Sequence, residues 1–131
     1  MKFNRRKVTT VLASLMAAPL ISCDSTSSQE IEETNMYGLI AKITAIDGKR
    51  DALSSILIEG LREMPGNLSY IVANDAANAN DLWITEVWVD QAAHQNSLSL
   101  SSVQKAIKVA RPLMAGMVRI AETRPVGGEG L

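Results

Sequence analysis

The side chains best suited to acid–base chemistry lie close together, between Glu86 and His94. His94 is the only histidine of the chain, and a neutral imidazole can accept a proton near neutral pH. Trp88 can stack on a flat ring and donate one hydrogen bond through its indole. Glu86 lies two residues before Trp88, so both side chains share one face of a strand.

The role of Glu86 depends on its surroundings. A carboxylate buried on that face has a raised pKa unless a cation pairs with it. Glu86 can orient His94, act as the base itself, or form a structural ion pair with Lys108 or Arg111. Trp88 and His94 also have purely structural alternatives: Trp88 can be a core residue, and His94 can be an exposed or capping residue.

The pattern of apolar residues predicts the elements that position these side chains. Alternation predicts strands over residues 37–46, 68–74, 82–89 and 117–124. Apolar residues at helical spacing predict a helix over 49–64, with Asp47 as a candidate N-cap and Pro65–Gly66 as its stop. A second helical region comprises a short piece over 91–96 and a longer helix from a capping box, Ser101 to Gln104, to about Ala115. Pro112 should bend or end this helix, and Gly116 should cap it.

The element order β-α-β-β-α-β is typical of the ferredoxin-like fold, an α+β arrangement with a four-stranded antiparallel sheet under two helices. The other face of that sheet would be uncovered in a monomer. Its expected residues are mostly apolar: Ile40, Ile71, Ala73, Trp83, Val87 and either Val118 or Ile120. Because so large an apolar face is unfavourable in water, we expect a homodimer in which two sheets pack face to face.

Strand alternation also predicts which residues line a cavity on the covered side of the sheet. Tyr37, Leu39, Tyr70 and Asn74 are expected to share that cavity with Trp88. The two tyrosines can hydrogen-bond a polar atom of a ligand, although a tyrosine in the core or at its rim is the more common case.

The first 35 residues predict export. Residues 1–22 combine four basic residues near the start with an apolar stretch too short to span a bilayer, as in a signal peptide. Leu20–Cys23 looks like a lipobox, so Cys23, the only cysteine, is the expected lipidation site. The pair Arg5–Arg6 leaves the general and the twin-arginine export routes both open. We therefore expect a membrane-anchored lipoprotein in the periplasm or on the cell surface, with a flexible tether over 23–35.

Length and composition limit the remaining possibilities. The chain has 131 residues and a formal net charge of −1, which gives one domain, over 36–126, and no electrostatic reason to bind nucleic acid. A loose, glycine-rich tail follows over 127–131. One histidine, one cysteine and scattered carboxylates lack the spacing of metal ligands, so no metal is expected.

Two segments resemble the antibiotic biosynthesis monooxygenase family, in particular its quinol monooxygenase branch. They are Met64–Tyr70, which reads MPGNLSY, and Glu86–His94, which reads EVWVDQAAH. The resemblance extends over about residues 36–126 and implies a dimeric α+β barrel of ferredoxin-like subunits. It also implies that Trp88 lines a pocket between sheet and helices, and that position 94 carries a polar or ionisable side chain within it.

The resemblance implies a cofactor-independent monooxygenase that oxidises a quinol, an anthrone or a similar phenolic compound with O₂. His94 is then the candidate base. Two alternatives stay open: a non-catalytic dimeric lipoprotein that binds an apolar ligand or a protein partner, and a dimeric scaffold without a ligand. Ser97 stands where many relatives carry a second histidine. The related haem-degrading branch has an asparagine at the position of Leu39 and a histidine near Leu98, which argues against haem degradation here.

Overall fold

The computed structural model describes residues 35–131. The expected signal peptide, the lipidation site Cys23 and residues 24–34 of the tether lie outside the described residues, so they stay predictions. Among the described residues, no helix is long and apolar enough to cross a membrane.

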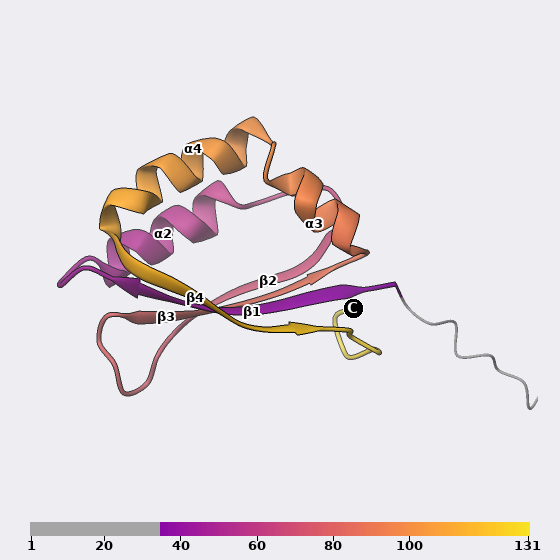
Figure 1. Ribbon diagram of the computed structural model, residues 1–131, viewed down its shortest axis with the longest axis horizontal. Coiled ribbons are helices and arrows are strands. Elements are labelled where there is room, and N and C mark those ends of the chain that lie inside the picture. The colour runs from indigo at the N-terminus through magenta and orange to yellow at the C-terminus, as the bar shows by residue number, and fades with distance from the viewer. Residues whose placement is uncertain (1–34) are drawn as a thin grey trace, which may run out of the picture. The chain divides into compact units, whose positions relative to one another are not determined.

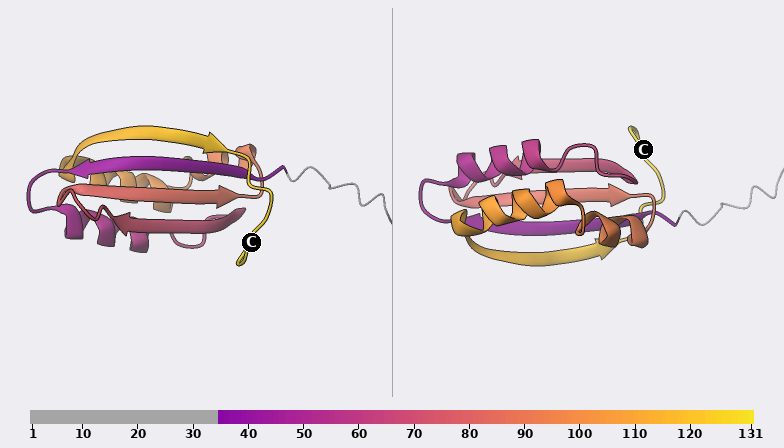
Figure 2. Two further views of the ribbon diagram at one scale, coloured as in Figure 1. Left: turned by 90° about the horizontal axis from the view of Figure 1, so that it is seen from below. Right: turned by 90° about the horizontal axis from the view of Figure 1, so that it is seen from above.

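Four strands form one antiparallel sheet, and the helices all lie over one of its faces (Figure 1). Its strand order is β2-β3-β1-β4, as seen from below in Figure 2. The predicted ferredoxin-like α+β fold is confirmed, with β3 inserted between β1 and β2. The elements are β1 (Tyr37–Ala45), α2 (Arg50–Gly60), β2 (Asn67–Asn74), β3 (Asp81–Trp88), α3 (Gln91–Ser97), α4 (Ser101–Ala110), the 3-10 turn η1 (Arg111–Leu113) and β4 (Met114–Thr123).

Both long helices end earlier than the sequence predicts. α2 stops at Gly60, although Met64 beyond it is still buried. α4 stops at Ala110 and passes into the 3-10 turn that contains Pro112, because proline has no N–H for a helical hydrogen bond. The chain is extended from Met114 onward, so Gly116 lies inside β4 and caps no helix.

The two predicted side-chain caps do not form. Lys49, and not Asp47, is the N-cap of α2, and Asp47 instead accepts a hydrogen bond of 2.6 Å from Asn80 Nδ2. In α4 the N-cap is Leu100. The Gln104 side chain donates to the Leu98 carbonyl at 2.6 Å, so it closes no capping box.

The buried side chains form two clusters between the sheet and the helices. The first lies mainly under α2 and consists of Ala41, Ile43, Ala45, Leu53, Leu57, Leu82, Ile84 and Ala110. The second comprises Tyr37, Leu39, Met64, Trp88 and Val103. On the opposite face of the sheet, Ile71 and Val118 are each 54% exposed, so that face leaves apolar side chains uncovered in a single chain.

Gly60 allows α2 and α4 to pack in close contact. A Cβ atom added at Gly60 would lie 2.6 Å from the Cβ of Ala106, closer than two carbon atoms can approach. Glycine at the end of α2 therefore permits the two helices to touch backbone to side chain. This contact determines where α4 lies relative to the sheet.

Candidate functional site

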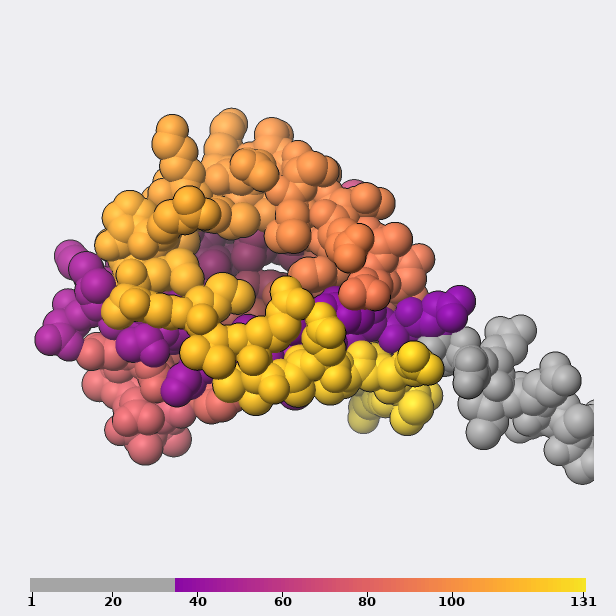
Figure 3. Space-filling model, in the orientation of Figure 1, coloured from indigo at the N-terminus to yellow at the C-terminus, as the bar shows by residue number. Residues whose placement is uncertain are grey.

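A cavity of about 420 Å³ lies between the sheet and the helices α2 and α4. Its mouth opens between α4 and β4, where Figure 3 shows a hollow between the orange and the yellow atoms. Most of the wall is apolar, with Leu39, Ile43, Leu57, Leu61, Met64, Ile84, Val103, Ala106, Ile107 and Met114 among its residues. Such a wall suits a flat, apolar ligand.

The cavity follows from the small side chains on the buried side of α4. Val103, Ala106 and Ala110 are buried there, whereas α2 buries Leu53 and Leu57. α2 packs on α4 and on β1, β2 and β3, while α4 packs chiefly on α2 and on η1, which follows it in the chain. α4 is positioned by its contact with α2, and its small buried side chains do not reach the sheet. The space left between α4 and the sheet is the cavity.

One end of the cavity is polar, and β3 supplies two of its residues. In the antiparallel register Trp88 lies opposite Tyr37, and Glu86 lies opposite Leu39 on one side and Tyr70 on the other. All of them therefore point toward the helices. Trp88 is 1% exposed, and its Nε1 donates a 2.8 Å hydrogen bond to Glu86 Oε2.

α3 brings His94 to the same end. Asp90 caps this helix by accepting a 2.7 Å hydrogen bond from the Ala93 amide. His94 is 8% exposed, and its ring lies between those of Tyr37 and Trp88, at centroid distances of 5.2 and 5.4 Å. Its Nε2 is 3.8 Å from Glu86 Oε2. The base and the carboxylate predicted from the sequence are thus neighbours.

Burial sets the protonation of this pair. It lowers the pKa of His94 from 6.5, and the charge of Arg119 lowers that pKa further, while Glu122 opposes them. Burial raises the pKa of Glu86, against the hydrogen bond from Trp88 and the charge of Arg119. His94 is therefore neutral near pH 7 and can accept a proton.

A second polar pair comes from β4 and is not foreseen from the sequence. The Tyr37 hydroxyl donates to Glu122 Oε1 at 2.7 Å, and Arg119 donates to the same oxygen at 2.8 Å. Burial and this hydrogen bond raise the pKa of Tyr37. Plain alternation would place Arg119 and Glu122 on opposite faces. A bulge, in which Ile120 has no partner on β1, brings both to one face.

The other predicted residues divide into those that line the cavity and those that do not. Leu39 and Tyr70 line it, and burial followed by the charge of Glu86 raises the pKa of Tyr70. Tyr37 does not line the cavity, but its ring packs against the imidazole of His94. Asn74, the last residue of β2, is exposed and does not line the cavity.

Three further findings concern the polar end. Glu86 forms no ion pair with Lys108 or Arg111, so the structural pairing considered from the sequence does not occur within residues 35–131. The Ser97 hydroxyl donates to the His94 carbonyl at 2.6 Å and lines the cavity. Among the described residues, no group of three or more His, Cys, Asp or Glu could hold a metal ion.

Comparison with known proteins agrees with the fold. Residues 36–109 match the family described as antibiotic biosynthesis monooxygenase. The chain therefore belongs to this family. No curated protein matches it.

Solved structures extend the comparison. A protein from Chloroflexus aurantiacus J-10-fl, assigned to the antibiotic biosynthesis monooxygenases, is 54% identical, with a TM-score of 0.70 over 72% of this chain and 96% of that chain. A Caulobacter crescentus CB15 protein with the same assignment is 17% identical, with a TM-score of 0.65 over 72% and 93%. A Pseudomonas aeruginosa protein is 22% identical, with a TM-score of 0.63 over 72% and 97%. The last two show the fold alone.

Proposed function

We propose that the protein is a cofactor-independent monooxygenase that oxidises a quinol, an anthrone or a similar phenolic compound with O₂. One observation carries the proposal. The single histidine is buried and neutral at the polar end of an apolar cavity, with Trp88 and Glu86 beside it. A flat ring fits the apolar wall, and its hydroxyl group would reach His94.

The chemistry begins with a proton transfer. His94 accepts the phenolic proton, and the phenolate gives an electron to O₂ far more readily than the phenol does. The substrate radical and superoxide then combine to form a C–O bond. The proton returns from His94 to the peroxide and gives a hydroperoxide. Its O–O bond then breaks together with the C–H bond of the same carbon, and a C=O bond forms. One oxygen atom stays in the product, and the other leaves as H₂O with the hydrogen of that carbon.

The neighbours of His94 have separate roles in this proposal. Glu86 stabilises the imidazolium that forms after proton transfer, at the observed 3.8 Å. Trp88 forms the side of the cavity against which a ring can stack. Tyr37 fixes the other side of the imidazole and is itself anchored by Glu122.

The proposal extends to a homodimer in which two copies pack through the uncovered face of the sheet. The exposed side chains Ile71 and Val118 support it, since an apolar sheet face is unfavourable in water. Sedimentation equilibrium of the purified protein at micromolar concentration tests it, and a stable monomer would contradict it. A lipid on Cys23 would add a membrane anchor, which suits a membrane-soluble quinol.

The decisive experiment measures O₂ consumption by the purified protein with a panel of hydroquinones and anthrones. Autoxidation without protein is subtracted. We expect turnover by the wild type and a loss of about 100-fold or more in His94→Gln, because general base catalysis contributes that much. Gln95→Ala, on the exposed side of α3, is the matched control and should keep the wild-type rate.

The outcomes separate the alternatives. Equal rates in the wild type and in His94→Gln would exclude His94 as the base. No rate above autoxidation for any compound would overturn the monooxygenase proposal and favour a protein that only binds its ligand. Circular dichroism of each variant shows whether a lost rate reflects a lost fold.

A further inference from the structure

The wall of the cavity carries more positive than negative charge. It includes two guanidinium groups, those of Arg111 and Arg119, and one carboxyl group, that of Glu86. Arginine is charged at all physiological pH values, whereas burial makes the charged form of Glu86 less favourable. Glu122, outside the wall, offsets the charge of Arg119. Among the described residues of the wall, the positive charge without a carboxylate beside it is therefore that of Arg111, and it favours a ligand that brings negative charge.

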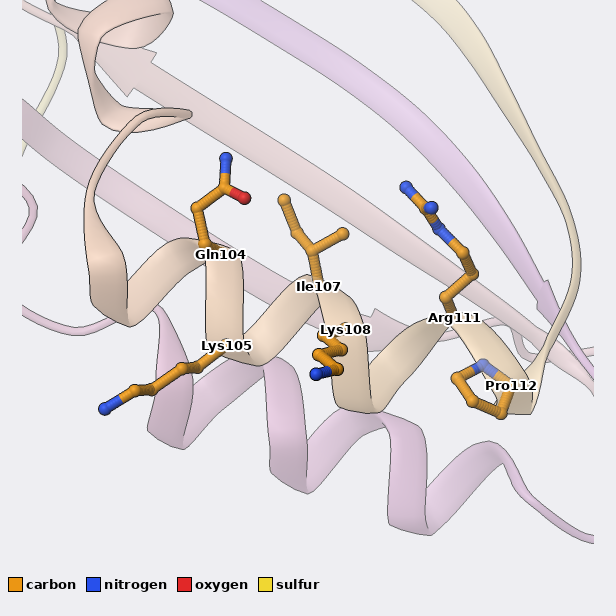
Figure 4. A pocket seen from close by; sticks show the side chains of 6 residues that line it. All are labelled: Gln104, Lys105, Ile107, Lys108, Arg111 and Pro112. Atoms are coloured by element: carbon orange, nitrogen blue, oxygen red, sulfur yellow. The ribbon is translucent and has the colours of Figure 1, made fainter.

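The position of Arg111 at the cavity suits it to bind such a ligand. It is the first residue of η1, directly after α4. Within residues 35–131 its guanidinium has no hydrogen bond or ion pair. Figure 4 shows Ile107 and Arg111 leaving α4 on the same side, with the Arg111 side chain extending toward the strands. A free guanidinium beside an apolar wall matches the planar fork that binds a carboxylate.

Arg119 adds a second cation on the opposite side of the mouth. Its register partner on β1 is Ala41, so its side chain lies on the face of the sheet that carries the cavity. It is 55% exposed, and one nitrogen donates to Glu122 at 2.8 Å. A guanidinium has five N–H donors, so the pair with Glu122 leaves donors that a ligand can use.

The surface that leads to the mouth is also cationic. A groove of about 540 Å³ along α4 shares Ile107 and Arg111 with the cavity. Lys105 and Lys108 also line this groove, and no carboxylate does. An anion that approaches along α4 therefore meets positive charge before it reaches the cavity, which increases the rate of encounter at low salt.

We propose that the substrate is a phenolic aromatic compound with an acidic substituent, and that Arg111, assisted by Arg119, binds this substituent at the mouth. The ring then contacts the apolar wall, and the hydroxyl group reaches His94. The inference rests on the proposed function, because it uses the same cavity. Because Arg111 is exposed, water solvates its guanidinium without a ligand, and the carboxylate would replace that water.

Binding of two matched ligands tests the proposal without any turnover. We would titrate the full chain by isothermal calorimetry with 2-naphthol and with 6-hydroxy-2-naphthoate, which adds a carboxylate at the far end of the same rings. The wild type should bind the carboxylate at least about tenfold more tightly, as expected for a charged hydrogen bond. Arg111→Gln should abolish this preference, and Arg119→Gln should reduce it, while 2-naphthol affinity stays within about twofold in both. Arg62→Gln is the control, since Arg62 is exposed and does not line the cavity.

Each other outcome has a definite meaning. Equal affinity of the wild type for both ligands would overturn the preference for an acid but leave the cavity as a binding site. A loss in Arg62→Gln as large as in Arg111→Gln would also overturn it, because the effect would then be one of net charge. Binding of neither ligand would overturn the proposed function together with this inference.

Discussion

The two long helices over the sheet differ in what they pack against. α2 places Leu53 and Leu57 directly on the strands, and Leu53 is fully buried. α4 instead packs on α2, where Ala106 contacts Gly60. Its buried side chains are small: Val103, Ala106 and Ala110. Both helices are amphipathic and of similar length, so the difference lies in side-chain volume.

This difference separates stability from binding. The core around Leu53 is filled, and close packing there stabilises the fold. The side under α4 is left open, and its space holds the buried histidine and its carboxylate. Polar groups are tolerated there because they bond one another, as Trp88 does with Glu86. One sheet thus carries both a close-packed core and a cavity.

The largest expected effect is on the filled side. Leu53→Ala should lower the free energy of unfolding by about 2–5 kcal/mol, because it leaves a void in a closed core. Leu61→Ala removes the same atoms from the cavity wall, where the new space joins an existing one, and should cost less than about 2 kcal/mol. Urea denaturation of both variants measures the difference. Equal losses would show that the two sides are packed alike.

A smaller effect is expected where α2 and α4 touch. Gly60→Ala forces a methyl group to 2.6 Å from Ala106, and such overpacking should cost about 1–3 kcal/mol. Gly116→Ala is the control, since nothing lies within 4 Å of its added Cβ. A double-mutant cycle with Ala106→Gly should show coupling, because the second change removes the contacting atom. Additive losses would mean that the contact does not hold α4 in place.

The smallest effect is the pH dependence of stability on the hollow side. The folded pKa of His94 is below 6.5, so its contribution is present above pH 6.5 and is lost as the pH falls through the folded pKa. Glu86 acts in the opposite direction: its pKa is raised from 4.5, so its contribution is lost as the pH rises through the folded pKa.

Glu86→Gln removes the contribution of Glu86 to the pH dependence of stability, so that the contribution of His94 can be measured alone. In that background, thermal unfolding midpoints should fall between about pH 7 and pH 5.5. The fall should be smaller when His94→Gln is added. An identical pH profile with and without His94 would contradict the burial effect on its pKa.

The sequence predicts the strands well and the helix ends poorly. Alternation alone places Glu86 and Trp88 on the covered face of β3, because β3 pairs there with β1 without a register shift. The end of α4 is missed because the apolar periodicity continues past Pro112, although the missing N–H ends the helix first. The fold class depends on the order of the elements, which small errors at their ends do not change.

The candidate site is predicted only in part for a similar reason. The position of His94 beside Trp88 follows from a short α3 that starts at once after β3. The pairing of Tyr37 with Glu122 does not follow, because a bulge reverses the alternation of β4. Asn74 shares the face of Tyr70 but ends an edge strand, where it is exposed.

The bulge in β4 also has a genetic consequence. Ile120 has no partner on β1, while Arg119 lies opposite Ala41 and Ala121 lies opposite Ile40. Deletion of the codon for Ile120 would remove a residue that the ladder does not use, and Glu122 would still face Tyr37. Deletion of a paired residue elsewhere in the strand would turn every later side chain to the other face. Position 120 is therefore one place where this strand can change in length while Arg119 and Glu122 keep their face.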